Sequence, residues 1–214
     1  RKDREICMLY DKDIREPLFD FLEEAYGKLR IIEEKQVGKS RADIVMVLPG
    51  LLTGIEIKSD ADSYVRLSRQ VKDYDRFFDR NMVVAGSSHA AHVREHVPGW
   101  WGIITVEQND REIDFYVLRQ PQENPMMNWK RKLSLLWRPE LAHIQELTAM
   151  PRYKEKSKAF VIEKILAKVP GEQLSVLVSE ELFERDYTRI EEVIRAYKIQ
   201  NRPELKGRTG KRKR

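Results

Sequence analysis

The chain has 214 residues, of which 41% are hydrophobic and 35% are charged, and its formal net charge is +5. This length and apolar content suffice for one packed domain with a small appendage, and the positive charge favours an anionic partner. The single cysteine excludes an internal disulfide framework. Because no apolar run approaches the ~20 residues of a membrane span and no signal-peptide pattern is present, we expect a cytoplasmic protein with no membrane partner.

The first predicted elements are a helix and a strand. Apolar residues recur at helical spacing from Ile14 to Tyr26, which predicts an amphipathic helix over residues 13–27 that ends at Gly27. Residues 30–35 are predicted to form the first strand.

The next stretch, residues 41–58, predicts two apolar strands joined by a turn at Pro49-Gly50. In an antiparallel hairpin about that turn, Asp43 and Glu56 are equally far from its centre and therefore face each other. Glu56 and Lys58 are two residues apart on one strand, so their side chains point to the same side of the sheet. The hairpin is therefore expected to gather two carboxylates and an amine on one patch.

These side chains are the candidate chemical site. Asp43 and Glu56 offer carboxylate oxygens to Mg²⁺ or Mn²⁺, and the carbonyl of Ile57 offers another. Lys58 could orient or deprotonate an attacking water, or stabilise charge on a phosphate. The alternative is a structural ion pair in which the lysine only neutralises two acids.

The local sequence favours the catalytic alternative at one position. A Glu-x-Lys pattern occurs three times, at Glu33–Lys35, Glu56–Lys58 and Glu204–Lys206. Only the second copy lies in an apolar, β-branched strand that follows an Asp-bearing strand. Charges on such a strand are unfavourable unless they are paired or bind a metal.

A helix is predicted over residues 62–79, just after the lysine strand. Gln70 could hold the attacking water or a substrate phosphate. Arg66 and Arg69 lie close to it on the helix and are candidates for contacts with a nucleic-acid backbone, or form an ordinary solvated face. We assign Tyr74 to the core.

Strands and helices alternate through the rest of the first half. Residues 82–86 and 102–107 are predicted as buried strands with a helix over 88–96 between them, and 113–118 as a strand that forms a hairpin with 102–107. This alternation predicts an α/β fold with a mixed sheet flanked by helices.

The composition changes at Pro121, where a linker is followed by predicted helices. Their ranges are 128–137, 139–149, 156–168 and 172–198. We predict a core of residues 1–120, a helical C-terminal subdomain of residues 121–200 and a basic, disordered tail of residues 201–214. The helical part has a weak resemblance to SAP-type nucleic-acid modules, and a generic helical subdomain is the alternative.

The motifs resemble the PD-(D/E)xK nuclease superfamily, with Asp43 as the first acid and Glu56-Ile57-Lys58 as its E-x-K. The segment Gln70-Val-Lys-Asp-Tyr74 resembles the Q-x-x-x-Y motif of RecB-type nucleases. Together with Arg41-Ala-Asp43 and Val97-Pro-Gly-Trp-Trp-Gly102, these motifs also resemble a small family of bacterial and phage proteins known by a locus-tag name, which is assigned to the same superfamily.

The resemblance implies a restriction-endonuclease-like sheet and a Mg²⁺-dependent nuclease that acts on nucleic acid, with DNA the expected substrate. It adds Arg41 to the candidate nucleic-acid contacts, and it makes Glu16 a candidate for an additional acid. On the first predicted strand, Glu33 or Glu34 could also approach the site, and the sequence does not choose between them. The alternatives are an inactive nuclease fold that binds DNA and a regulatory factor in phage–host conflict that binds a protein. The sequence does not fix the oligomeric state, and a dimer is compatible with it.

Overall fold

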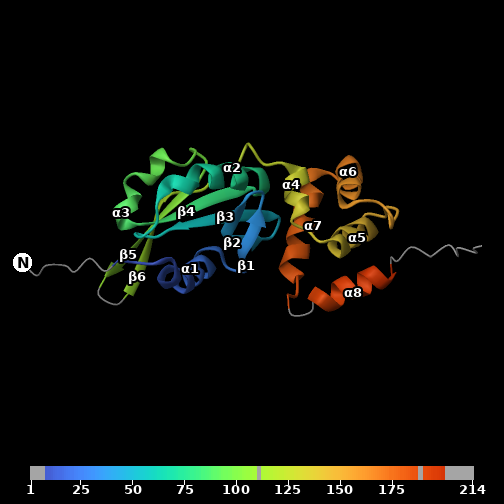
Figure 1. Cartoon of the computed structure of the whole chain (residues 1–214), viewed down its shortest axis with the longest axis horizontal. Helices are drawn as coiled ribbons and strands as arrows, with labels where there is room; N and C mark the ends of the chain where they lie inside the picture. Colours follow the sequence, from blue (N-terminus) through green and yellow to red (C-terminus); the bar gives the residue numbers. More distant parts are fainter. Residues whose placement is uncertain (1–7, 110–111, 188–189, 201–214) are drawn as a thin grey trace, which may run out of the picture.

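The computed structural model describes residues 8–109, 112–187 and 190–200, and it contains a six-stranded mixed sheet with helices on both faces (Figure 1). The strands lie in chain order, with β3–β4 and β4–β5 parallel and the other neighbours antiparallel. Their bounds are β1 Arg30–Val37, β2 Ser40–Leu48, β3 Leu51–Lys58, β4 Arg80–Gly86, β5 Gly102–Asn109 and β6 Glu112–Arg119. The predicted α/β class with a mixed sheet is therefore confirmed.

Side chains of the central strands alternate between two apolar layers. Ile44 and Met46 face the layer that contains α1 (Asp11–Tyr26), whereas Val45 and Val47 face the layer that contains α2 (Leu67–Phe77). This alternation is the period of two expected for a strand buried on both faces. Figure 1 shows α1 on one face of the sheet and α2 on the other.

The β2–β3 hairpin has the predicted register. Leu48 pairs with Leu51 and Ile44 with Ile55, which places the turn at Pro49-Gly50. Gly50 has a φ of 71°, a left-handed conformation that glycine adopts without the steric cost of a Cβ. One further step of the same register sets Asp43 opposite Glu56.

Two predicted helices are shorter than expected. The segment 88–96 contains a short helix, α3 (Ser87–Ala90), and a 3₁₀ turn, η2 (Val93–Glu95), in place of one helix. The segment 62–79 begins with a 3₁₀ turn, η1 (Tyr64–Arg66), that leads into α2 and ends at Phe77. Short 3₁₀ turns are common at helix termini and connections.

The predicted helix over 172–198 is wrong, because the chain forms α7 (Gly171–Glu184) and α8 (Ile190–Gln200) instead. The reason lies at Arg185, which leaves the helix with extended backbone and is buried. Its guanidinium donates two hydrogen bonds to Glu140, at 2.6 and 2.5 Å, and one to the carbonyl of Leu135 at 3.0 Å. These contacts outweigh helix propensity, since a buried charge needs its partners.

The C-terminal helices continue the apolar layer that contains α2, and among them α7 packs against β2 and β3. They are α4 (Trp129–Ser134), α5 (Arg138–Leu147), α6 (Lys158–Lys168) and α7, and one apolar cluster includes sheet residues such as Val45 and helix residues such as Leu174. Lys132 is fully buried and donates to Asp79 at 2.7 Å. The predicted subdomain boundary at 121 stays a prediction.

Across residues 8–109, 112–187 and 190–200, the structure has no helix of the length and apolarity that a bilayer crossing requires. The predicted disordered tail, residues 201–214, lies outside the described residues.

Candidate functional site

All predicted site residues except Glu16 line one polar cavity of about 490 Å³ between α1, the β1–β2 hairpin, the end of β3 and α2. The predicted residues that line it are Glu34, Arg41, Asp43, Glu56, Ile57, Lys58, Arg66, Arg69 and Gln70. Glu16 is exposed on α1 and does not line the cavity, whereas its neighbour Arg15 does. The fold thus brings together predicted residues that are up to 36 positions apart in the sequence, from Glu34 to Gln70.

Glu56 is the centre of a buried hydrogen-bond network, with an exposure of 1%. Lys58 Nζ donates to Glu56 Oε1 at 2.7 Å and to Gln70 Oε1 at 3.1 Å, and Gln70 Nε2 donates to the same Glu56 oxygen. The Tyr74 hydroxyl donates to Glu56 Oε2 at 2.5 Å. This network fixes the carboxylate and the amine in one orientation.

Asp43 lies at a point where β2 forms no backbone ladder pair with either neighbouring strand. The β1–β2 pairing passes from Glu33–Ile44 to Lys35–Ala42, and the β2–β3 pairing ends at Ile44. The Asp43 backbone N–H instead donates to the Tyr74 hydroxyl at 3.1 Å, and its Oδ2 accepts from the backbone N–H of Ile57 at 2.8 Å. Strand irregularities of this kind often re-aim a side chain next to a functional site.

Burial and the facing Glu56 carboxylate raise the pKa of Asp43 to about 7. The Ile57 N–H and the Lys58 ammonium act in the opposite direction and offset part of that rise. A carboxyl group with a pKa near neutrality exchanges protons, or a proton for a cation, in the physiological range.

Arg15 connects α1 to this site. Its guanidinium donates to Asp11 at 2.7 Å, to Glu33 at 3.1 Å and to Glu34 at 2.6 Å, and its Nη2 lies 3.8 Å from Asp43 Oδ1. Burial lowers the pKa of Arg15, but the surrounding acids raise the pKa by more than burial lowers it, so the group stays protonated.

Tyr74 and Arg15 are two residues that contact Asp43 or Glu56 and that the sequence analysis did not assign to the site. Tyr74 is fully buried, as predicted for a core residue, but its hydroxyl joins Asp43 to Glu56. Its place in the Q-x-x-x-Y motif was the available signal. Arg15 had no local signal that points to the site, because its partners other than Asp11 are on strands about 20 to 30 residues away.

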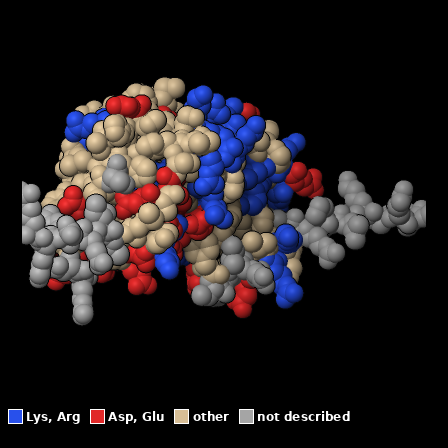
Figure 2. All heavy atoms as spheres, turned by 60° about the vertical axis from the view of Figure 1, so that its left-hand side comes forward, with Lys and Arg blue, Asp and Glu red and all other residues tan. Residues whose placement is uncertain are grey.

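The cavity is acidic at its floor and basic at its rim. Lys39, Arg41, Arg66 and Arg69 line it together with the buried carboxylates. Figure 2 shows Lys and Arg side chains gathered in one broad band on the visible face of the molecule, with Asp and Glu side chains beside it. A basic rim around a polar cavity fits an anionic ligand.

The family model described as Bacteriophage P4 protein cII matches residues 7–202. The chain belongs to this family. It is similar to Protein cII of Enterobacteria phage P4, with 28% identity over 101 residues. That match spans 47% of this chain and 38% of the phage P4 protein, so well under half of that relative is covered.

The structure also has a distant similarity to one solved structure, that of Pyrococcus furiosus SfsA in complex with Ca²⁺. The sequence identity is 17%, the TM-score is 0.30, and the match covers 51% of this chain and 60% of that chain. We draw no conclusion about fold, metal or activity from similarity at this level. The matched family is thus a phage protein family. The resemblance to the locus-tag family and membership of the PD-(D/E)xK superfamily both stay predictions.

The donors in the cavity of this cII-family chain fit a hard divalent cation. Asp43 Oδ1 lies beyond hydrogen-bond distance of Arg15. Within the described part of the chain, Glu56 Oε2 accepts from Tyr74 alone, which leaves it one lone pair. Among the described residues no group of three or more His, Cys, Asp or Glu side chains is placed to hold a metal. Mg²⁺ commonly takes one or two carboxylates and completes its shell with water and substrate oxygens.

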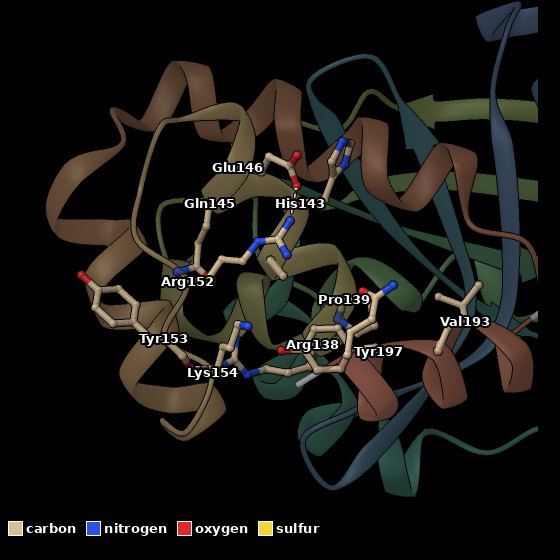
Figure 3. Close-up of a pocket in the computed structure, with 13 residues that line it drawn as sticks. Arg138, Pro139, His143, Gln145, Glu146, Arg152, Tyr153, Lys154, Val193 and Tyr197 are labelled. Atoms are coloured by element: carbon tan, nitrogen blue, oxygen red, sulfur yellow. Dashed lines mark hydrogen bonds and ion pairs between the residues drawn. The ribbon is translucent and has the colours of Figure 1, made fainter. Parts of the chain in front are cut away.

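A second cavity, of about 310 Å³, lies in the helical part between α5, the segment after it and α8 (Figure 3). Arg138, Tyr153 and Tyr197 are among the residues that line it, and Arg138 donates to the carbonyl of Tyr153 at 2.8 Å. None of the predicted site residues lines this cavity. The candidate chemistry is therefore confined to the cavity at the sheet.

Proposed function

We propose that this cII-family chain is a metal-dependent nuclease that hydrolyses phosphodiester bonds in nucleic acid, with DNA as the first substrate to test. The observation that supports this most directly is the meeting of Asp43, Glu56 and Lys58 in one cavity with a basic rim. The resemblance of the same residues to PD-(D/E)xK motifs points to the same chemistry.

Two carboxylates beside one lysine cost more free energy than a purely structural ion pair requires. Lys58 needs one carboxylate for neutralisation, and Glu56 supplies it at 2.7 Å. Asp43 adds a second carboxylate whose pKa is raised to about 7 by burial and by Glu56, so its charged form is destabilised in the fold. Two facing carboxylates of this kind are stable together when a cation binds between them.

Each group in the cavity has a role in this proposal. Asp43, Glu56 and the carbonyl of Ile57 would hold Mg²⁺ or Mn²⁺. When bound, such a cation polarises a phosphoryl oxygen and offsets the charge that develops during hydrolysis. Lys58 uses two of its three N–H donors on Glu56 and Gln70, so the third is available to orient a water or to contact the phosphate.

The remaining groups would orient the substrate. Gln70 accepts from Lys58 and donates to Glu56, which fixes the amine over the carboxylate, and its place in the cavity allows contact with a water or a phosphate. Arg41, Arg66 and Arg69 would contact phosphates of the backbone, which positions a nucleic acid without selecting its sequence.

One observation favours a second candidate function, a nuclease fold that binds nucleic acid without hydrolysing it. Lys58, Gln70 and Tyr74 already donate to the two Glu56 oxygens, so this carboxylate has little remaining capacity for a metal. Such a module would bind DNA in EDTA, with an affinity that falls steeply with salt, and would show no turnover.

Incubation of the purified chain with linear, circular and single-stranded DNA in Mg²⁺, Mn²⁺ or EDTA distinguishes these functions. We expect divalent-dependent cleavage that Lys58→Ala and Asp43→Asn abolish while both variants stay folded by circular dichroism. Lys35→Ala is the matched control, because Lys35 belongs to another Glu-x-Lys pattern and does not line the cavity. Cleavage that survives in both site variants would refute the proposal, and DNA binding without cleavage would support the second candidate.

A further inference from the structure

Glu34 has an unusual backbone directly beside the candidate site. Its φ is 54°, in the left-handed region that non-glycine residues seldom adopt. The β1–β2 register places Glu34 opposite Asp43, and the pairing skips these two residues. Left-handed backbone at a non-glycine residue costs free energy and tends to persist where the side chain has a function.

The Glu34 side chain bridges two arginines. Its Oε1 accepts from Arg15 Nη2 at 2.6 Å, and its Oε2 forms an ion pair with Arg41 Nε at 2.5 Å. In regular strand geometry successive side chains alternate between the two faces of the sheet, and the left-handed residue interrupts this alternation at Glu34. Glu34, Arg15 and Arg41 all line the cavity.

The two arginines differ in how many of their N–H donors remain available for a ligand. Arg15 is largely committed, because it also donates to Asp11, Glu33 and the carbonyl of Asp43. Arg41 has no other ion pair among the described residues, and its side chain is 67% exposed. Its ion pair with Glu34 is made through Nε, which leaves the outer edge of the guanidinium, formed by the two Nη groups, available as a bidentate donor.

We propose that Glu34 is a positioning residue that holds the Arg41 guanidinium at the mouth of the cavity as a clamp for a substrate phosphate. This inference rests on the proposed function, because it takes the ligand of the cavity to be a nucleic-acid backbone. It assigns to Glu34 a role in substrate binding, in place of the additional acid that the sequence analysis suggested. Arg15 contacts the same carboxylate, and it thereby keeps Arg41 at a fixed position relative to Asp43.

The chain offers a matched control for the backbone effect. Ala149 is the other non-glycine residue with positive φ among the described residues, at 51°, and it lies just beyond the end of α5, away from the cavity. Glycine relieves left-handed strain at either position, whereas only Glu34→Gly removes a carboxylate from the cavity.

The experiment measures melting temperature and the affinity for an uncleaved DNA duplex in EDTA for the wild type, Glu34→Gly, Glu34→Gln and Ala149→Gly. We expect Ala149→Gly to raise the melting temperature by roughly 2–4 °C and to bind DNA as the wild type does. Glu34→Gly should melt at or above the wild-type temperature, because relief of strain offsets the lost surface ion pairs. It should nevertheless bind DNA about tenfold more weakly, with a salt slope reduced by about 1.

Glu34→Gln retains the left-handed backbone and loses the charge, so it should weaken DNA binding without a gain in melting temperature. In Mg²⁺, both Glu34 variants should raise KM far more than they lower kcat, since they disturb a binding contact. Wild-type affinity in Glu34→Gly would overturn the role of Glu34 while leaving the proposed function intact. A wild type that binds no DNA at moderate salt would overturn both.

Discussion

Replacement of Asp43 by Asn should stabilise the metal-free protein above neutral pH, although it removes a side chain central to the site. Burial and Glu56 raise the pKa of Asp43 from 3.8 to about 7. Because the folded state binds the proton more tightly than the unfolded state, the contribution of Asp43 to stability is full below pH ~4 and is lost as the pH rises through 7. Asn has no titrating group, so the variant does not lose folding stability in this way.

The size of the effect follows from the two pKa values. A difference of about 3 between them corresponds to about 4 kcal/mol of unfolding free energy, which is an upper bound because the Asp43 side chain is 20% exposed. The Asn amide oxygen can still accept the 2.8 Å hydrogen bond from Ile57, so that contact is retained.

Urea denaturation in EDTA between pH 4.5 and 8.5 measures this difference. The curves of wild type and Asp43→Asn should lie close together at low pH and diverge by about 2–4 kcal/mol above pH 7, with the variant the more stable. Mg²⁺ should then stabilise the wild type alone. An Asp43→Asn variant that is less stable than the wild type by the same amount at every pH would show that the carboxylate is not strained by burial and Glu56.

Three other substitutions test the surroundings. Lys58→Ala should lower the unfolding free energy by about 3 kcal/mol in urea titrations in EDTA, because Glu56 stays buried without its cation; a loss below 0.5 kcal/mol would show that the ion pair is unimportant. Tyr74→Phe should cost about 1–3 kcal/mol, since the Asp43 N–H loses its acceptor, and wild-type stability of this variant would argue against that bond. Burial and neighbouring cations lower the pKa of Lys35 to about 8, so wild-type stability should fall as the pH drops from 10.5 to 8. Lys35→Met should weaken this dependence in melting curves, and the part that stays is expected from Lys132 and Lys158, whose pKa values burial also lowers.

The core of the candidate site could be predicted from the sequence because it depends on local rules. The turn at Pro49-Gly50 fixes the hairpin register, and a period of two on β3 places Glu56 and Lys58 on one side. Gln70 follows from a motif on the next helix. These residues are close in sequence, and their meeting requires little knowledge of tertiary packing.

The parts that could not be predicted depend on long-range contacts. Arg15 was missed in favour of Glu16 because the phase of α1 against the sheet is set by packing, not by local pattern. The left-handed backbone of Glu34 has no signature in a run of Glu-Glu-Lys. The break between α7 and α8 occurs because Arg185 binds Glu140, 45 residues earlier. Helix propensity contains no information on this contact and therefore predicted one continuous helix.

The central claim is that Asp43 and Glu56 jointly hold a divalent cation beside Lys58. Crystals grown in Mn²⁺ and measured at the manganese absorption edge test it most directly. The account predicts one strong anomalous peak in contact with both carboxylates, which disappears in Asp43→Asn crystals. A cavity without an anomalous peak, or a peak bound elsewhere while these carboxylates keep only their protein partners, would contradict it.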